Sequence, residues 1–412
     1  MKKNIANVIK VPMPIIVLSL LVAIFVDIKP INWIFAYGGT GEAEESGIMG
    51  ILYPAIAFLI VLFSFSYRKI KWHLNATIIF LVLYLSVFYY ISNSLIGPSK
   101  TVLTFLMAFV LSALVIPSIA VIDAKSFLRA VMTLPSIAIF RLERVFSPMY
   151  SYSDVISMDV SYAFLIPIVA TIVYLTCYLK YDQRITKCLM IFISVINLVF
   201  LIQIFLHGSR GPLLSVILLV LFLMVVKKRE FAPGISYSKG KLGFVFLFMF
   251  VFLACYVLFL QTIMDILSFA GVESHAIDKI LELIAEGDLS NGRANLNTIT
   301  INGIIEHLFF GNGFDRYHAN TGMLYPHNFI LQILYDGGLL YFFVILTPVV
   351  MGIVRICKKC NNDEYSIMTF LFFSSVPGAL FSNNLYASSI LWLFFGFTVS
   401  KYFIYKPKLM SK

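Results

Sequence analysis

The chain has 412 residues, of which 60% are hydrophobic and only 13% are charged. Soluble domains have about 45–50% apolar and about 25% charged residues, so this composition excludes an ordinary soluble fold. The formal net charge is +10, but topology explains it better than nucleic-acid binding does, because the basic residues gather in short segments on one side of the membrane. The apolar runs are continuous, which favours helices over the alternating strands of a transmembrane β-barrel. We therefore expect an all-α polytopic integral membrane protein.

Apolar segments near the length of a membrane-spanning helix recur about twelve times along the chain. The first resembles a signal peptide, but no small-residue cleavage site follows Val26, so we interpret it as a retained span. The fifth is the weakest, because it is short and contains Pro135. The predicted spans are residues 12–27, 48–66, 74–92, 101–122, 126–140, 161–179, 188–206, 212–226, 242–262, 338–357, 366–382 and 387–405.

Charge supports this arrangement of spans. If the N-terminus is cytoplasmic and the spans alternate, most of the 31 lysines and arginines fall inside, and most of the 21 acidic residues fall outside. This bias is the positive-inside pattern of membrane proteins. Without the fifth span, every later segment would change sides and the bias would be lost. We therefore predict one integral domain, residues 1–412, with both termini in the cytoplasm.

One external connection, residues 263–337, is far longer than the usual few residues, which is typical of a functional loop. It contains two apolar patterns with helical spacing. The first consists of Ile277, Ile280, Leu281 and Ile284, and the second of Ile301, Ile304, Ile305, Leu308 and Phe309. We expect two amphipathic helices that lie on the membrane surface or cap a cavity.

Two arginines lie at the predicted starts of helices. Arg210 precedes Pro212, a residue suited to the first position of a helix. Arg293 follows Ser290 and Asn291, which are suitable N-caps. Free N–H groups and the helix dipole make such positions anion sites. The alternatives are an interfacial membrane arginine for Arg210 and a solvated loop residue for Arg293.

His327 opens a segment that reads HNFILQILYDGG. Pro326 suggests a helix start, and two glycines end that helix before the tenth span. Asn328, Gln332 and Asp336 recur every four residues and form a polar stripe on an otherwise apolar helix. A histidine in this place is either a structural residue or a general base that works near neutral pH.

Other motifs in the loop carry weaker signals. The glycines of GNGF, residues 311–314, predict the end of the second loop helix. Arg316 and His318 are further candidates without a pattern of their own. The pair Cys357 and Cys360 lies beside lysines at a span end, and we interpret it as incidental. We find no nucleophile elbow, zinc-type cluster or aspartate-rich motif.

Taken in order, these motifs resemble those of the O-antigen ligase and Wzy-type polymerase superfamily. SRGPLL (residues 209–214) is similar to its arginine-x-x-x-leucine motif, and NGRANL (residues 291–296) to its second arginine motif. GNGF and HNFILQILYDGGLL (residues 327–340) resemble its glycine-rich turn and its histidine–asparagine motif. Asp336 stands where that motif usually has a glutamate, and the second arginine motif lacks its usual aromatic residue.

The resemblance implies a metal-independent glycosyl transfer, without a cofactor, at the periplasmic face of the bacterial inner membrane. The implied donor is a sugar chain on undecaprenyl diphosphate. Arginine suits such a leaving group because its planar donors bind a diphosphate without a metal, and the acceptor hydroxyl needs a base. The implied residues are the diphosphate ligands Arg210, Arg293 and Arg316, the base His327, and the supporting Asn328 and Asp336.

Within the superfamily we favour a polymerase, because the form of the motif that starts at His327, His-Asn-x3-Gln-x3-Asp-Gly-Gly, resembles that of polymerases more closely. The expected partners are lipid-linked donor and acceptor, the bilayer, a chain-length regulator and a flippase, and no nucleic acid. A ligase that transfers the finished chain to lipid A–core is the runner-up. A flippase for the same lipids is an alternative of another class, but no predicted span has a clear mid-membrane charge.

Overall fold

The computed structural model describes the chain in segments, with a few isolated positions between residues 62 and 285 besides. The main described segments are residues 13–36, 55–60, 122–136, 154–207, 210–228, 234–245, 293–313, 316–323, 325–380 and 388–404. The predicted spans at 74–92 and 101–122 and the first loop helix fall almost wholly outside the described residues.

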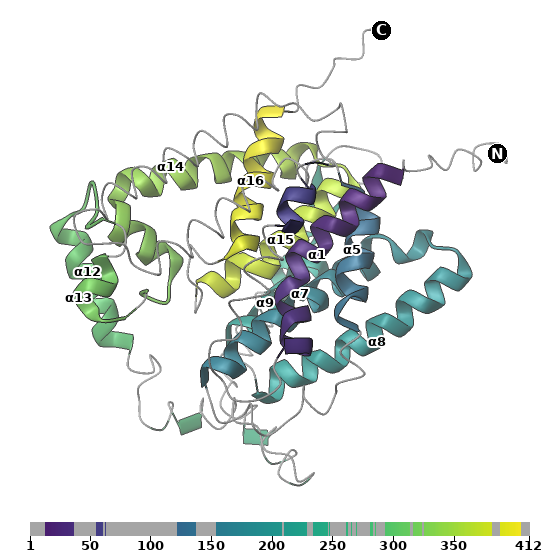
Figure 1. The fold of residues 1–412 in the computed structure, drawn as a ribbon, viewed down its shortest axis with the longest axis horizontal. Helices are drawn as coiled ribbons and strands as arrows, with labels where there is room; N and C mark the ends of the chain where they lie inside the picture. The colour runs from purple at the N-terminus through teal and green to yellow at the C-terminus, as the bar shows by residue number, and fades with distance from the viewer. Residues whose placement is uncertain are drawn as a thin grey trace.

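The described part of the chain is almost entirely helical, as the sequence predicts (Figure 1). Helices satisfy their own backbone groups, which long apolar segments require in a membrane. The helices are α1 (Met13–Ala36), α5 (Ala124–Thr133), α7 (Asp154–Cys177), α8 (Arg184–His207), α9 (Arg210–Val225), α12 (Arg293–Glu306), α13 (Arg316–Thr321), α14 (Phe329–Lys359), α15 (Asn362–Ala379) and α16 (Ser389–Ile404), with the short 3-10 turn η3 (Leu179–Tyr181).

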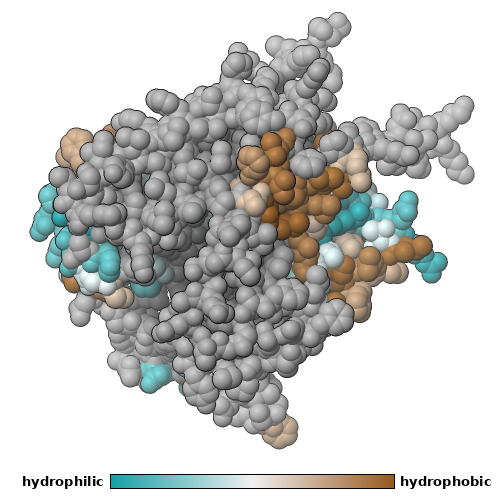
Figure 2. Space-filling model, viewed as in Figure 1, coloured by the Kyte–Doolittle hydropathy of each residue, from teal (hydrophilic) through white to brown (hydrophobic). Residues whose placement is uncertain are grey.

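Helix α7 is the centre of the main core and packs against α5, α8, α9 and α15. Its described side chains are mostly apolar, and Phe164, Leu165, Val169 and Val173 are fully buried. Helix α8 lies at the edge of this bundle and exposes one apolar side, including Ile185. In Figure 2 hydrophobic surface covers this edge, next to the hydrophilic end where α7 and α8 are joined. Such a surface is suited to contact with lipid.

A buried carboxylate holds the connection between α7 and α8 to α5. The Asp182 side chain has no exposed surface, and its Oδ1 lies 2.5 Å from Lys125 Nζ and 2.6 Å from Arg129 Nη2. The Tyr174 hydroxyl donates to the other carboxylate oxygen, and Arg129 Nε donates to that hydroxyl at 2.6 Å. Burial opposes ionisation, but the hydrogen bonds and the two cations together hold the pKa of Asp182 below its usual value.

A short hairpin follows α9. Strand β1 (Val226–Lys228) pairs antiparallel with β2 (Ile235–Tyr237). The N–H of Gly234, just before β2, donates to the carbonyl of Cys360 at 3.2 Å. The hairpin therefore joins the end of α9 to the end of α14.

The number of spans stays a prediction. Among the described residues, two segments are long and apolar enough to cross a membrane, Arg184–Ile202 and Phe329–Lys359. Helix α5, at the place of the predicted fifth span, has only 10 residues and ends before Pro135. That length gives about 15 Å, half of the roughly 30 Å hydrocarbon core, so this helix does not cross by itself. The predicted sidedness depended on that span and is therefore untested.

Candidate functional site

Helices α12 and α13 pack against the first part of α14 and form a unit of their own, at the left of Figure 1. This unit has a small core separate from the main one, made of Ile304, Tyr317 and Tyr335, one from each helix. It contains the second arginine motif, the GNGF turn and the histidine–asparagine motif. The part of the long loop that the structure describes is therefore folded, as its periodicity predicts.

Tyr335 is the residue around which this unit packs. Its ring meets that of Tyr317 edge-on, with centroids 5.2 Å apart, and its hydroxyl accepts a hydrogen bond from Asn320 Nδ2 at 2.8 Å. A Cβ added at Gly303 would lie 2.5 Å from the Tyr335 ring, so the close approach of α12 and α14 depends on that glycine. Neither Tyr335 nor Gly303 was identified from the sequence. An isolated glycine inside a helical pattern often indicates close packing, and Gly303 was such a signal.

Helix α14 is interrupted at Gly338, which has φ 63° and ψ −164°. The predicted break before the tenth span is confirmed. A break leaves backbone N–H and carbonyl groups without partners inside the helix, so they need partners elsewhere. Here the turn that follows α12 satisfies them through four hydrogen bonds: Asn312 N to Tyr335 O (2.7 Å), Gly313 N to Asp336 O (2.9 Å), Leu339 N to Leu308 O (2.8 Å) and Leu340 N to Phe309 O (3.2 Å). We call this arrangement the glycine joint.

Two glycines allow the backbones of the glycine joint to meet. A Cβ at Gly338 would lie 2.5 Å from the carbonyl carbon of Phe309, and one at Gly311 would lie 2.5 Å from that of Asp336. Gly311 has φ 72°, and its N–H bonds to the carbonyl of His307 at 2.8 Å, so it ends the helical region as predicted. Asn312 adds a side-chain bond to the carbonyl of Gly303 at 2.9 Å. The two glycine motifs are thus halves of one structure that links α12 to α14.

The prediction that His327 lies within a helix is wrong. Helix α14 begins at Phe329, and Asn328 is its N-cap, with Oδ1 accepting from the N–H groups of Ile330 (2.9 Å) and Leu331 (3.2 Å). The capping side chain, and not Pro326, determines where the helix starts.

His327 stands just before that cap in the left-handed region, with φ 55°. Its half-buried ring lies beside Tyr325, with centroids 4.6 Å apart. Non-glycine residues rarely adopt this conformation, and it recurs at functional sites, where the surrounding structure enforces it.

The polar stripe divides into two parts. Asn328 is a cap, whereas Gln332 and Asp336 are buried within α14, with 4% and 3% of their surface exposed. A carboxylate this buried does not reach a bulky sugar. Asp336 is therefore placed to support the glycine joint, in which its own carbonyl takes part.

The three arginines each begin a helix. Helix α9 starts at Arg210, α12 at Arg293 and α13 at Arg316, so the predicted helix starts at Arg210 and Arg293 are confirmed. The side chains of Arg210 and Arg293 lie outside the description, whereas that of Arg316 is half-buried beside the Gly313 turn. A common diphosphate site for Arg210 and Arg293 remains an expectation. His318, two residues after Arg316 in α13, is also half-buried.

The start of α9 is fixed by packing against α7 and α15. The Tyr162 hydroxyl of α7 donates to the carbonyl of Gly378 in α15 at 3.2 Å. A Cβ at Gly211 would overlap that hydroxyl, and one at Gly378 would lie 2.5 Å from the Tyr162 ring. The residue after Arg210 is therefore tightly enclosed. Nothing in the sequence pattern indicated Tyr162.

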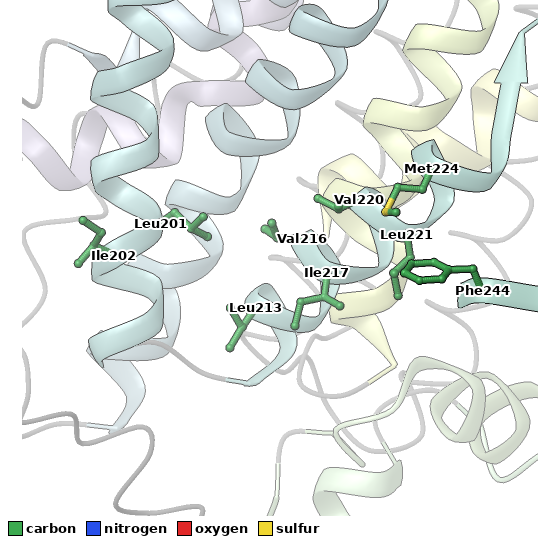
Figure 3. Close-up of a pocket in the computed structure, with 9 residues that line it drawn as sticks. All are labelled: Leu201, Ile202, Leu213, Val216, Ile217, Val220, Leu221, Met224 and Phe244. Carbon is green, nitrogen blue, oxygen red and sulfur yellow. The ribbon is translucent and has the colours of Figure 1, made fainter. Parts of the chain in front are cut away.

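A cavity of about 580 Å³ runs along α9 beside α8 (Figure 3). It begins near Leu213, about one turn beyond Arg210. Its described lining is entirely apolar, so it suits a hydrocarbon chain and not a phosphate or a sugar. The lining residues are Leu201, Ile202, Leu213, Val216, Ile217, Val220, Leu221, Met224 and Phe244.

No group of three or more histidine, cysteine, aspartate or glutamate side chains within the described segments is placed to hold a metal ion. Cys357 and Cys360 are free thiols. Burial, together with the nearby Glu364 carboxylate, raises the pKa of the Cys360 thiol to about 11. This thiol is protonated at neutral pH, whereas metal binding and redox exchange use the thiolate.

A family model described as O-antigen ligase matches residues 195–346. This segment is therefore similar to the O-antigen ligase family. The matched segment contains the starts of α9 and α12, the glycine joint and His327. No curated protein matches the chain.

The match supports the expected superfamily of O-antigen ligases and Wzy-type polymerases. It supports a membrane protein of polysaccharide biosynthesis, because members of that family are membrane enzymes of the ligase or polymerase type. The match does not distinguish those two activities, and it gives no support to a transporter.

Proposed function

We propose that the chain polymerises undecaprenyl-diphosphate-linked oligosaccharide repeat units into an O-antigen-type polysaccharide. The observation that carries the proposal is the match of residues 195–346 to the O-antigen ligase family. Within that segment the glycine joint links α12, which begins at Arg293, to α14, which His327 precedes. A glycosyl transfer requires its base and its leaving-group ligands to be held in register. The glycine joint supplies a rigid connection between the elements that carry them.

In the proposed reaction His327 accepts the proton of a sugar hydroxyl on the acceptor. The hydroxyl oxygen attacks the anomeric carbon of the donor as the bond from that carbon to the diphosphate oxygen breaks. A histidine has an ordinary pKa of about 6.5, so its neutral form is available as a base near pH 7. The products are the lengthened chain and undecaprenyl diphosphate.

The leaving diphosphate gains negative charge in the transition state, and we assign its stabilisation to Arg210 and Arg293, with Arg316 as a further ligand. Arginine binds phosphate oxygens through two parallel N–H bonds and stays charged at all physiological pH values. Each of these residues begins a helix, where free backbone N–H groups also favour an anion. Asn328 supports His327 by fixing the start of α14.

The acceptor distinguishes the two family activities. In the proposed polymerase it is a second lipid-linked repeat unit, and in a ligase it is lipid A–core. The form of the histidine–asparagine motif favours the polymerase. We place the protein in the bacterial inner membrane as a multi-pass protein with cytoplasmic termini, working with a flippase and a chain-length regulator.

A deletion strain tests the proposal through electrophoresis of its lipopolysaccharide. Loss of a polymerase leaves core that carries one repeat unit, because ligation continues. Bare core would instead indicate a ligase or a flippase. Complementation with His327→Ala at normal protein level is the matched control, since it restores the protein without the proposed base.

A further inference from the structure

Most of the predicted apolar pattern at the end of α12 and in the turn after it faces away from the protein. This helix packs on α14 through Gly303 and Ile304, and Thr300 is buried beside them. Four residues of the predicted apolar pattern are exposed instead, together with the following Phe310. We call them the apolar tip: Ile301 (46% exposed), Ile305 (66%), Leu308 (40%), Phe309 (66%) and Phe310 (77%). Clustered large apolar side chains of this kind mark an interaction surface.

The apolar tip is continuous with the lipid-facing side of α14. Two bonds of the glycine joint, from the N–H groups of Leu339 and Leu340, attach the backbone of the tip to the first residues after the break. From there α14 runs on to Lys359, within the segment Phe329–Lys359 that is long and apolar enough to cross a membrane. Leu340 and Phe343, at the start of that run, are also exposed. The apolar surface of a spanning helix therefore extends sideways onto the tip.

A polar surface accompanies the apolar tip on the same helix. Asn302 and Glu306 are exposed and lie about 100° around the axis from Ile301 and Ile305. In Figure 2 hydrophobic and hydrophilic surfaces lie side by side on the described part of this unit, at the left of the view. Apolar and polar side chains exposed next to each other in this way are suited to the boundary between lipid and water.

We propose that the apolar tip inserts into the membrane leaflet that α14 enters just after Gly338. The insertion anchors the unit formed by α12, α13 and the first part of α14 to the membrane surface. A lipid surface is the occupant that the continuity with α14 favours over a second protein copy. The role of this insertion rests on the proposed function: it holds the segments around Arg293 and His327 at the depth of a lipid-linked diphosphate. A substrate with a membrane-embedded tail has its diphosphate at the boundary between lipid and water. The depth at which the protein holds its site is therefore part of how it recognises that substrate.

Spin labelling of the full-length protein in nanodiscs tests the insertion. Labels are placed singly at Ile305 and Phe309, and at Asn302 and Glu306 as matched positions, after the native cysteines are replaced. We measure the ratio of oxygen access to access by a water-soluble nickel chelate at each label. We expect this ratio to be at least tenfold higher at Ile305 and Phe309 than at Asn302 and Glu306. Equal nickel access at all four positions would overturn the proposal. Low access of both reagents at the first pair, with dipolar broadening, would overturn it in favour of a second copy.

A second measurement avoids the cysteine replacements. Phe309→Trp adds one indole to the native chain, and brominated lipids quench indoles that enter the hydrocarbon region. Compared with the native chain, we expect additional tryptophan fluorescence from position 309. Brominated lipids should quench this additional fluorescence more strongly than iodide does. Quenching by iodide alone would place the tip in water and contradict the proposal.

An activity assay separates this proposal from the proposed function. Ile305→Asp should raise the KM for an undecaprenyl-linked donor about tenfold and leave kcat for a short, water-soluble prenyl donor unchanged. Asn302→Asp is the control, because it adds the same charge on the polar face. An unchanged KM would show that insertion has no role in substrate recognition. Full turnover by His327→Ala would instead overturn the proposed function and leave the insertion intact.

Discussion

Replacing Gly338 by alanine should open the glycine joint. The backbone of Gly338 has φ 63° and ψ −164°, a region that only glycine adopts readily. A Cβ there would also lie 2.5 Å from the carbonyl carbon of Phe309 and 2.6 Å from the nitrogen of Gly311. Both neighbours are backbone atoms held by the joint, so neither moves without breaking its hydrogen bonds.

The strained backbone alone costs about 1–3 kcal/mol, and the backbone overlap adds to it. We therefore expect Gly338→Ala to destabilise the closed joint by roughly 3 kcal/mol, which is about a hundredfold in its closing equilibrium. Amide hydrogens of Leu339 and Leu340, which donate to the turn after α12, should exchange faster by a similar factor. Turnover should fall because α12 and α14 lose their fixed spacing.

Hydrogen–deuterium exchange with mass spectrometry measures this opening peptide by peptide in nanodiscs. Gly240→Ala is the matched control, since a Cβ at that exposed helical position meets nothing within 4 Å. Alanine there should be neutral or stabilising by about 0.5–1 kcal/mol. Protection at Leu339 and Leu340 that is unchanged in Gly338→Ala would refute the role assigned to the joint.

Three further predictions concern single side chains. His327→Ala should lower kcat by about 10²–10⁴ and leave donor binding intact, as measured with purified protein; equal kcat would show that His327 is structural. Arg210→Lys keeps the charge but loses the bidentate fork, so kcat/KM should fall at least tenfold; wild-type turnover would make Arg210 a membrane anchor. Because the folded pKa of Asp182 is lowered, its stabilisation is present above about pH 4 and is lost as pH falls through the folded value. Asp182→Asn should therefore lower Tm at pH 7 and weaken its dependence on pH in the acid range, and an unchanged Tm profile would contradict the buried ion cluster.

Helix boundaries were predictable where local chemistry determines them. Arg210 and Arg293 begin helices as their neighbouring residues indicate, and the two glycines interrupt α14 where expected. His327 was placed wrongly because two start signals compete, and the asparagine cap overrides the proline.

Contacts between segments distant in sequence were beyond prediction. The meeting of the Gly311 turn with Gly338, and the position of Tyr162 between α9 and α15, depend on tertiary packing that leaves no periodic signal. The basic residues Lys125 and Arg129 counted toward the predicted sidedness, yet the structure pairs both with Asp182. A charge that forms a buried cluster is a weaker topological signal than a solvated one.

The most direct test of the central claim is reconstitution with a single substrate. Purified protein in proteoliposomes receives an undecaprenyl-diphosphate-linked repeat unit, with no lipid A–core present. The account predicts a ladder of longer lipid-linked chains and the release of undecaprenyl diphosphate. New glycosidic bonds that form only after lipid A–core is added, or movement of the lipid without any new bond, would contradict it.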